Sequence, residues 1–176
     1  MTHQSRSSIT AAAILALAST TSSHGVFAQN LKEQLVGTWS LSQLHAVTWD
    51  DDSRNPFGNN PEGRLIFERS GRVICVIIGT DRPKFALGDR LSGTPEENKA
   101  AVQSTQAFYG TYKVNEDDRT VIFHVDRSSF PNWDGTEQVS TMTITGDTLD
   151  QAKRGPRGSW GYAVWKRILG KVALND

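Results

Sequence analysis

The sequence contains one cysteine, no excess charge of either sign and no apolar run long enough to cross a membrane. Cys75 is the only cysteine among the 176 residues, so no internal disulfide can form and packing must hold the fold together. It lies in the apolar run 73–78, where a small buried side chain is a better interpretation than a reactive thiol. Lysine plus arginine and aspartate plus glutamate number 19 each, which argues against a nucleic-acid partner.

The motifs that identify common enzymes and metal sites are also missing. The chain has no HExxH pair, no nucleophile elbow around a serine and no glycine-rich phosphate loop. His45 and His124 have no third ligand at a diagnostic spacing, so we predict no metal site and no cofactor. The cluster Lys153, Arg154 and Arg157 indicates a solvated turn. Enzyme activity stays undecided on these grounds.

The beginning of the chain has the three-part pattern of a secretory signal. Arg6 precedes the ten-residue run ITAAAILALA, and Val26 and Ala28 are the small residues expected before a cut after Ala28. A cut after Ala18 is the alternative. The apolar run is much shorter than the roughly 20 residues of a membrane-spanning helix, so a retained membrane anchor is the weaker interpretation.

We therefore predict a cleaved signal peptide over residues 1–28 and one domain over residues 29–176, secreted or periplasmic, with no membrane span after signal removal. In this domain, a short helical turn is expected around 31–35. Residues 39–49 then alternate with a period of two, which is typical of a strand. Turn residues separate further short apolar stretches, so eight strands are predicted, over 39–49, 63–67, 73–78, 109–114, 120–126, 137–145, 148–152 and 162–168.

Eight short antiparallel strands with hairpin spacings favour an all-β up-and-down barrel over a sandwich. One helix interrupts them between strands 3 and 4. Thr94 and Glu97 form a capping box with Pro95 at the first helical position, which predicts a helix of about thirteen residues. The continuous apolar run 73–78 indicates a strand covered on both faces, so we expect this helix to pack against the sheet.

The two ends of the domain carry a matching pair of motifs. Gly37-Thr38-Trp39 opens the first strand, and Trp165-Lys166-Arg167 closes the last. This pair resembles the closing signature of lipocalin-type barrels, in which a basic side chain lies across the indole at the narrow end. The resemblance implies that Arg167, with Lys166 as second choice, covers Trp39.

Several longer segments between these ends resemble the bacterial and fungal lipocalin-like domain family of the calycin type. The resemblance covers about residues 35–167 and rests on segments 55–66, 81–86, 88–89, 93–97, 109–112 and 130–133. It implies an eight-stranded calyx with a helix inserted between strands 3 and 4. It implies no particular activity.

His124 and Arg64 are the candidate polar anchors of a ligand in the barrel. His124 shares one strand face with Ile122 and Asp126; if that face points inward, the imidazole can bind a carboxyl or hydroxyl group or move a proton. The family resemblance implies a histidine at this position, and a structural histidine is the alternative. His45 is a further candidate for the cavity, although solvent exposure is the favoured interpretation.

Arg82 lies in the long connection before the predicted helix. One interpretation pairs it with an anionic ligand, and the favoured one pairs it with Asp89 to hold the loop. Four aromatic residues are candidates for the walls of the cavity or for the core. Among them Trp133 stands in a connection and is expected to cover the opening. The four are Tyr109, Tyr112, Phe130 and Trp133.

These features lead to three hypotheses on function. The first is an exported lipocalin-like protein that binds a small apolar or aromatic molecule inside the barrel. The second is a cofactor-free isomerase, cyclase or dehydratase that uses His124 as acid or base in the same cavity. The third is an interaction protein whose barrel has no cavity.

Overall fold

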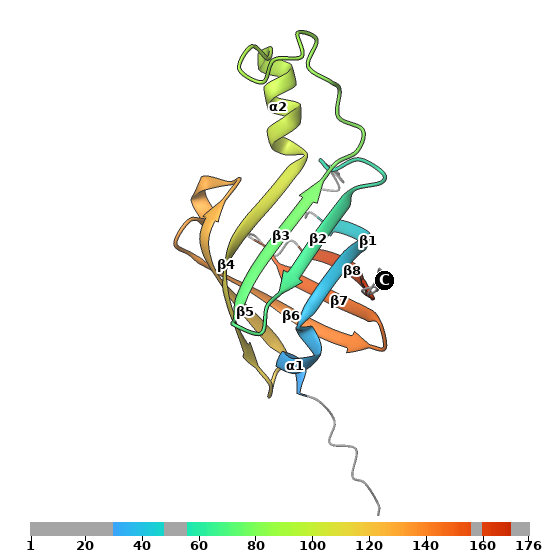
Figure 1. Ribbon diagram of the computed structural model, residues 1–176, viewed down its shortest axis with the longest axis vertical. Helices are drawn as coiled ribbons and strands as arrows, with labels where there is room; N and C mark the ends of the chain where they lie inside the picture. Colours follow the sequence, from blue (N-terminus) through green and yellow to red (C-terminus); the bar gives the residue numbers. More distant parts are fainter. Residues whose placement is uncertain (1–29, 48–55, 156–159, 170–176) are drawn as a thin grey trace, which may run out of the picture.

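Eight antiparallel strands form a closed barrel in the computed structural model, which describes residues 30–47, 56–155 and 160–169. Each strand pairs with the next, and β8 pairs with β1, so the predicted all-β barrel with a helix between strands 3 and 4 is confirmed (Figure 1). The predicted signal peptide, Trp49 and Arg157 lie outside the described residues. The strands are β1 (Gly37–Val47), β2 (Glu62–Phe67), β3 (Arg72–Ile78), β4 (Thr105–Asn115), β5 (Thr120–Ser128), β6 (Glu137–Thr145), β7 (Thr148–Arg154) and β8 (Trp160–Arg167).

Alternation along the strands sends one set of side chains into the barrel. Phe67 packs against Tyr112 with 4.8 Å between ring centroids, and against Phe123 at 6.1 Å. Burial of this apolar surface is the main stabilising contribution. The buried hydrophobic residues of the strands are Trp39, Leu65, Phe67, Val73, Cys75, Ile77, Phe108, Tyr112, Val121, Phe123, Val125, Met142, Leu149, Ala163 and Trp165.

Two irregularities change which residues face inward. In β1 the register shifts between Leu41 and Gln43, so the inward positions move from odd to even numbers and His45 is exposed. The unbroken alternation predicted for 39–49 is therefore wrong, because a β-bulge adds one residue to the strand. In β4 the register shifts between Tyr109 and Gly110.

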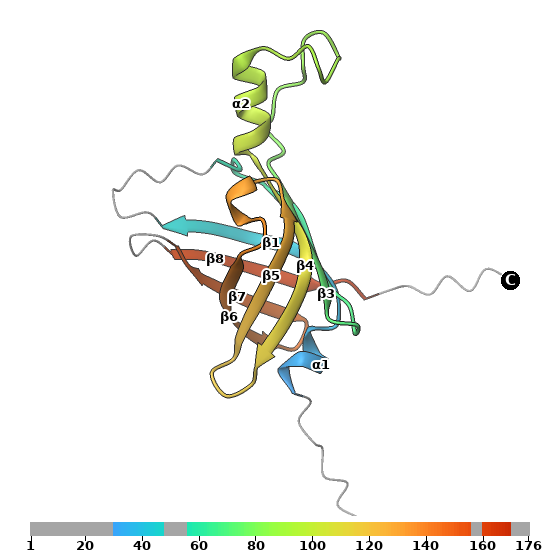
Figure 2. The same ribbon diagram turned by 90° about the vertical axis from the view of Figure 1, so that its left-hand side faces the viewer.

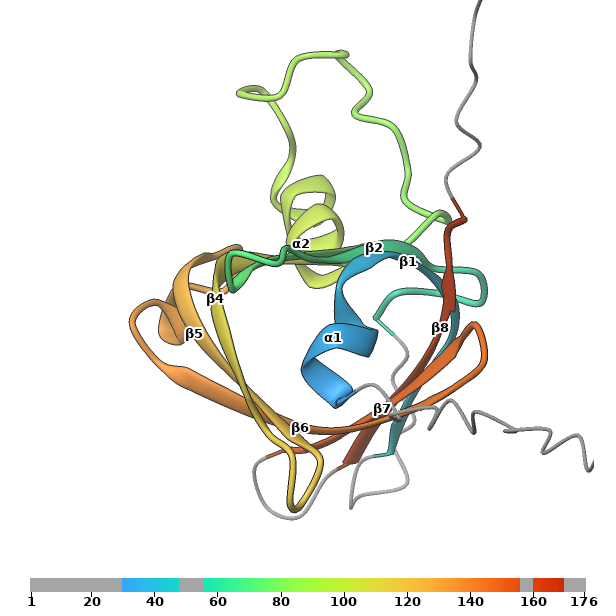
Figure 3. The ribbon, with the colours of Figure 1, turned by 60° about the horizontal axis from the view of Figure 1, so that its bottom comes forward.

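A short helix closes one end of the barrel. α1 (Leu31–Leu35) lies across this opening, with Leu31 and Leu35 buried (Figure 3). The Asn30 side chain caps the helix by accepting from the Glu33 amide. Glu116, between β4 and β5, accepts from the Leu31 amide at 2.7 Å and so ties the helix to the barrel.

Trp39 and Arg167 hold this closed end together. The Arg167 guanidinium lies 4.1 Å from the centroid of the Trp39 ring. It also donates to the carbonyl oxygens of Val36 at 3.2 Å and Gln34 at 2.7 Å. The Trp39 indole donates to the Leu35 carbonyl at 2.8 Å. A single cation thus connects the last strand, the first strand and the chain that leaves α1.

The second helix differs from its prediction in length and in packing. α2 (Pro95–Gln103) has the predicted capping box of Thr94 and Glu97, but it ends earlier than expected and β4 begins at Thr105. It stands beyond the end of the barrel opposite α1 and has no buried residue (Figure 1). The apolar residues of α2 are mostly alanine, so a longer helix would bury little apolar surface. The chain forms β4 instead, because the strand places Phe108 in the core. No helix among the described residues is long and apolar enough to cross a membrane.

Arg167→Ala should lower the free energy of unfolding by about 2–3 kcal/mol, because it removes a cation–π contact and two hydrogen bonds to carbonyl groups. Urea denaturation measures this change. Lys166→Ala is the matched control, since Lys166 is an exposed neighbour whose ammonium donates to the Thr148 hydroxyl. It should cost less than about 0.5 kcal/mol. Equal effects of the two substitutions would contradict the closure described above.

Gly110→Ala should prevent stable folding or cost more than about 3 kcal/mol, because the new Cβ would lie 2.0 Å from the His124 carbonyl oxygen. That oxygen belongs to the backbone of the neighbouring strand and cannot move aside. Gly161→Ala is the control, because its Cβ would meet no atom closer than the Lys153 carbonyl oxygen at 4.0 Å. Thermal unfolding of both variants measures the difference, and a stable Gly110→Ala protein would show the strand pairing to be wrong.

Candidate functional site

A cavity of about 570 Å³ opens at the end of the barrel opposite α1. It lies where β4, β6 and β8 begin and where β7 ends, beside the 3-10 helix η1 (Pro131–Trp133). Figure 2 shows η1 as the short orange turn at this end, below α2. We call this cavity the barrel mouth. Its described lining residues are Gln106, Trp133, Gln138, Lys153, Arg154, Gly155 and Gly161.

Lys153 is the central polar group of the barrel mouth. Its Nζ donates to Gln138 Oε1 at 2.6 Å and lies 3.8 Å from the centroid of the Trp133 ring. No salt bridge joins it to a carboxylate within the described part of the chain. Burial lowers the pKa of Lys153 to about 8. The ammonium is therefore partly desolvated, and the contacts found for it among the described residues, Gln138 and Trp133, are neutral.

Further polar groups lie deeper in the barrel and form hydrogen bonds with one another. The Trp165 indole donates to Gln151 Oε1 at 2.9 Å, and Gln151 Nε2 donates to the Ser140 hydroxyl at 3.1 Å. Cys75 lies close to Lys153, and burial raises the pKa of its thiol to about 12 despite the nearby ammonium. This agrees with the prediction of an unreactive cysteine. Below this level large side chains fill the closed half of the barrel, including Trp39, Phe67 and Phe123.

Three of the four predicted aromatic residues are in or next to the interior, at different depths. Trp133 lines the barrel mouth, where it makes edge-to-face contacts with Phe108 at 6.2 Å and Phe130 at 6.1 Å. Phe130 is 52% exposed and lies at the rim. Tyr112 is buried, and its hydroxyl donates to the Glu68 carbonyl at 3.0 Å. Tyr112 is therefore part of the core and does not line the barrel mouth.

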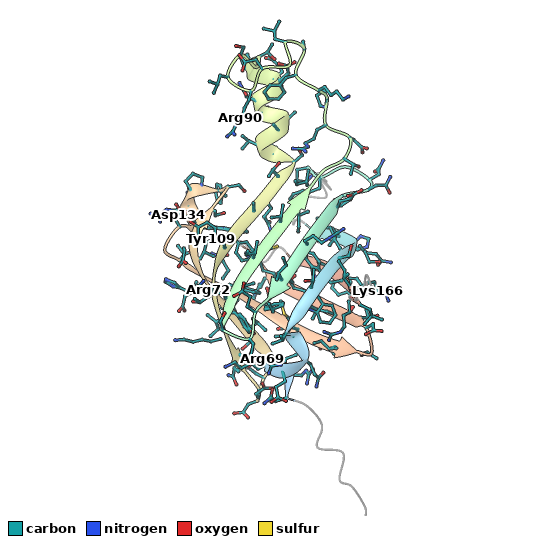
Figure 4. All side chains as sticks on the ribbon, viewed as in Figure 1. Arg69, Arg72, Arg90, Tyr109, Asp134 and Lys166 are labelled. Atoms are coloured by element: carbon teal, nitrogen blue, oxygen red, sulfur yellow. The ribbon has the colours of Figure 1, made fainter. Side chains whose placement is uncertain are left out.

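His124 and Tyr109 lie on the outside of the barrel, so the expectation of an inward His124 is corrected. Val121, Phe123 and Val125 form the inward set of β5, which places His124 on the exposed face. Tyr109 is 52% exposed and projects from the outer face of β4 (Figure 4). An acid–base role of His124 inside the cavity has no support from this geometry.

Arg64 and Arg82 lie at a second hollow on the outside of the barrel. This outer groove, of about 690 Å³, runs between the outer face of β2–β3 and residues 79–85. Arg64 donates to the Ser40 hydroxyl at 2.9 Å, and Arg82 donates to the Gly79 carbonyl at 2.9 Å. Both arginines are exposed. They are therefore not anchors inside the barrel, as Arg64 was expected to be.

The predicted ion pair of Arg82 with Asp89 is wrong. The Asp89 carboxylate instead accepts from the Leu91 amide at 2.9 Å and from the Ser92 hydroxyl at 2.6 Å, which forms a local turn. These bonds lower the pKa of Asp89. Local partners two and three residues away are available at a smaller loss of chain entropy than an arginine across the loop.

Lys153 is a site residue that the sequence did not predict. The cluster to which it belongs was interpreted as a solvated turn. Lys153 sits on the inward face of β7 together with Leu149 and Gln151. The sequence feature that indicates its orientation is Leu149, four residues earlier. An apolar residue at this position places Leu149, Gln151 and Lys153 on the inward face of the strand. Within the described residues no three His, Cys, Asp or Glu side chains are grouped to hold a metal ion.

A curated relative matches part of the chain. The 4'-hydroxy-3'-methoxypropiophenone carrier protein ppsC of Aspergillus oryzae is 39% identical over 97 residues, which cover 49% of this chain and 87% of that protein. Among solved structures, a fatty acid binding protein of Schistosoma mansoni in complex with arachidonic acid gives a TM-score of 0.40 at 14% identity, covering 78% of this chain and 98% of that one. A redesigned β-barrel gives a TM-score of 0.41 at 13% identity, covering 78% and 95%.

A family model also matches most of the chain. The family model described as a lipocalin-like domain matches residues 36–168. This range contains all eight strands of the barrel, from Gly37 in β1 to Arg167 in β8. It also contains the barrel mouth and the Trp39–Arg167 closure. The chain belongs to the family of proteins with a lipocalin-like domain.

Proposed function

We propose that this protein binds and carries a small aromatic molecule in the barrel mouth. The observation that carries the proposal is the lining of that cavity, which combines the ring of Trp133 with the half-buried ammonium of Lys153. Ligand cavities in proteins combine apolar and aromatic walls with a few polar groups that orient the ligand. The volume of about 570 Å³ lies within the range of such cavities.

The aromatic walls are held in fixed positions. Trp133 packs against Phe108 and Phe130 in edge-to-face contacts, and its carbonyl oxygen accepts from the Thr136 amide at 3.0 Å. A ring held in this way loses little conformational entropy when a flat ligand packs against it. Lys153 covers the Trp133 ring in the ligand-free protein, so we expect this side chain to move when a ligand takes its place.

The name of the Aspergillus oryzae relative supports a small aromatic ligand. That protein is called a carrier of 4'-hydroxy-3'-methoxypropiophenone, an aromatic ketone with a phenol group. A ligand of this class has a flat ring for Trp133 and oxygen atoms for Lys153 and Gln138. A carrier needs no catalytic residue, and His124, the predicted acid or base, lies on the outer face. We therefore favour transport or storage over turnover.

The outer groove is the rival location for a ligand. It is larger than the barrel mouth, but its two arginines are exposed and bond to nearby hydroxyl and carbonyl groups. Ion pairs at exposed sites contribute little binding energy because water screens them. The barrel mouth places its cation in a partly dry site, where the same interaction is stronger.

Trp133→Ala should weaken the binding of 4'-hydroxy-3'-methoxypropiophenone about tenfold or more, because an aromatic contact contributes about 0.5–1.5 kcal/mol beyond its buried area. Isothermal titration calorimetry on the purified protein measures the affinity. Tyr109→Ala on the outer face of β4 and Arg82→Ala in the outer groove are the controls, and both should bind as the unmodified protein does. Loss of binding in Arg82→Ala with full binding in Trp133→Ala would move the site to the outer groove.

We also propose that residues 1–28 direct export and are removed, so that the carrier acts in the periplasm or outside the cell. The three-part pattern around ITAAAILALA supports this. Mass spectrometry of the protein recovered from an exporting host should give an N-terminus at Gln29. An intact N-terminus in the cytosolic fraction would contradict export.

A further inference from the structure

The Lys153 ammonium has more hydrogen-bond donors than the protein uses. An ammonium group carries three N–H donors. One donates to Gln138 Oε1 at 2.6 Å, and the described residues offer Nζ no second hydrogen-bond acceptor. The Gln138 amide is oriented for this bond, because its Nε2 donates to the Thr136 hydroxyl at 2.9 Å. Lys153 Nζ also contacts the face of the Trp133 ring, 3.8 Å from the ring centroid.

The surroundings of Lys153 also contain no negative charge in the described part of the protein. The lining of the barrel mouth includes the cations Lys153 and Arg154 and no carboxylate. Asp134, at the end of η1, pairs with Arg127 at 3.9 Å and is labelled at the outer edge of the barrel in Figure 4. Cys75 also lies near Lys153, and burial keeps it a neutral thiol. The described residues therefore provide no counter-ion for the ammonium, and an anionic ligand would supply one.

We propose, on the basis of the proposed function, that the barrel mouth selects aromatic ligands with an acidic phenol group, and that Lys153 holds the phenol oxygen as the phenolate. The phenol proton passes to the buffer, and no covalent bond forms or breaks between protein and ligand. A phenolate presents one charged oxygen, which suits the compact charge of an ammonium. A carboxylate presents two oxygens and suits the fork of an arginine better.

Two chemical features make this ionisation favourable near neutral pH. A carbonyl group conjugated to the ring, as in the para-acyl phenols, lowers the phenol pKa below that of tyrosine. Lys153 has a pKa of about 8, so about nine-tenths of it is protonated at pH 7. The bound anion then stabilises the ammonium and raises the pKa of Lys153, since each charge favours the other.

A pair of ligands that differ only in the acidic group separates this proposal from the proposed function. The probes are 4'-hydroxy-3'-methoxypropiophenone and its 4'-methyl ether, which has the same ring and ketone but cannot ionise. With excess protein, absorbance at the phenolate band is followed from pH 6 to pH 10. We expect the bound phenol to ionise at least about one pH unit lower than the free phenol, a tenfold change in its proton equilibrium.

Lys153→Met should abolish this shift and weaken binding of the phenol more than binding of the methyl ether, and Lys153→Arg should keep part of the shift because the positive charge remains. Arg82→Met is the matched control outside the barrel and should leave the shift unchanged. As an independent measurement, the carbon-13 NMR signal of Lys153 Cε should titrate with a pKa of about 8 in the free protein and at a higher pH in the complex.

Each outcome decides between the two proposals. If both probes bind and the phenol ionises at the same pH bound and free, or if the shift survives in Lys153→Met, the phenolate assignment is overturned and the carrier function stands. If neither probe binds the unmodified protein, the support for the carrier function is lost as well. A covalent adduct on Lys153 after borohydride reduction would also overturn the assignment, because it would show an imine in place of an ion pair.

Discussion

Closure of the barrel is the constraint on which the rest of the structure depends. Because β8 pairs with β1, every strand turns alternate side chains into an interior of limited width. Large side chains fill that interior next to α1, where Trp39, Phe67 and Trp165 are fully buried. The Arg167 guanidinium seals the same end by bridging β8, Trp39 and two carbonyl groups, one in the last turn of α1 and one directly after it. The free space that we find inside the barrel therefore lies at the opposite end.

The polar residues inside the barrel differ in how fully they are hydrogen-bonded. Gln151 and Ser140 bond to each other, and the Trp165 indole donates to Gln151, which is typical of a structural network. Lys153 stands at the edge of this group with a single neutral acceptor and a lowered pKa. Burial of a charge with incomplete compensation costs stability. A loss of stability of this kind is expected where a side chain is placed to bind a ligand.

Local signals in the sequence predict the strands and the inserted helix, and the resemblance to lipocalin-type barrels adds the closing pair. The period of two along the strands, the capping box at Thr94 and the tryptophan and arginine at the two ends are each visible in short segments. The bulge after Leu41 has no such signal. It arises from strand pairing, and one extra residue moves His45 to the outside.

The site was harder to predict, because it depends on which face of each strand points inward. On β5, the apolar set Val121, Phe123 and Val125 fixes the orientation, and attention to this set places His124 outside. On β7, Leu149 is the one large apolar side chain, so the sequence signal that assigns Lys153 and not Arg154 to the inward face is weak. The closed barrel, with Leu149 packed in its core, makes this assignment clear.

The most direct test of the account is a crystal structure of the protein in complex with 4'-hydroxy-3'-methoxypropiophenone. The account predicts the ligand ring against Trp133 in the barrel mouth, with the phenol oxygen about 2.8 Å from Lys153 Nζ. A ligand seated in the outer groove beside Arg64 and Arg82, with the barrel mouth unchanged, would contradict it.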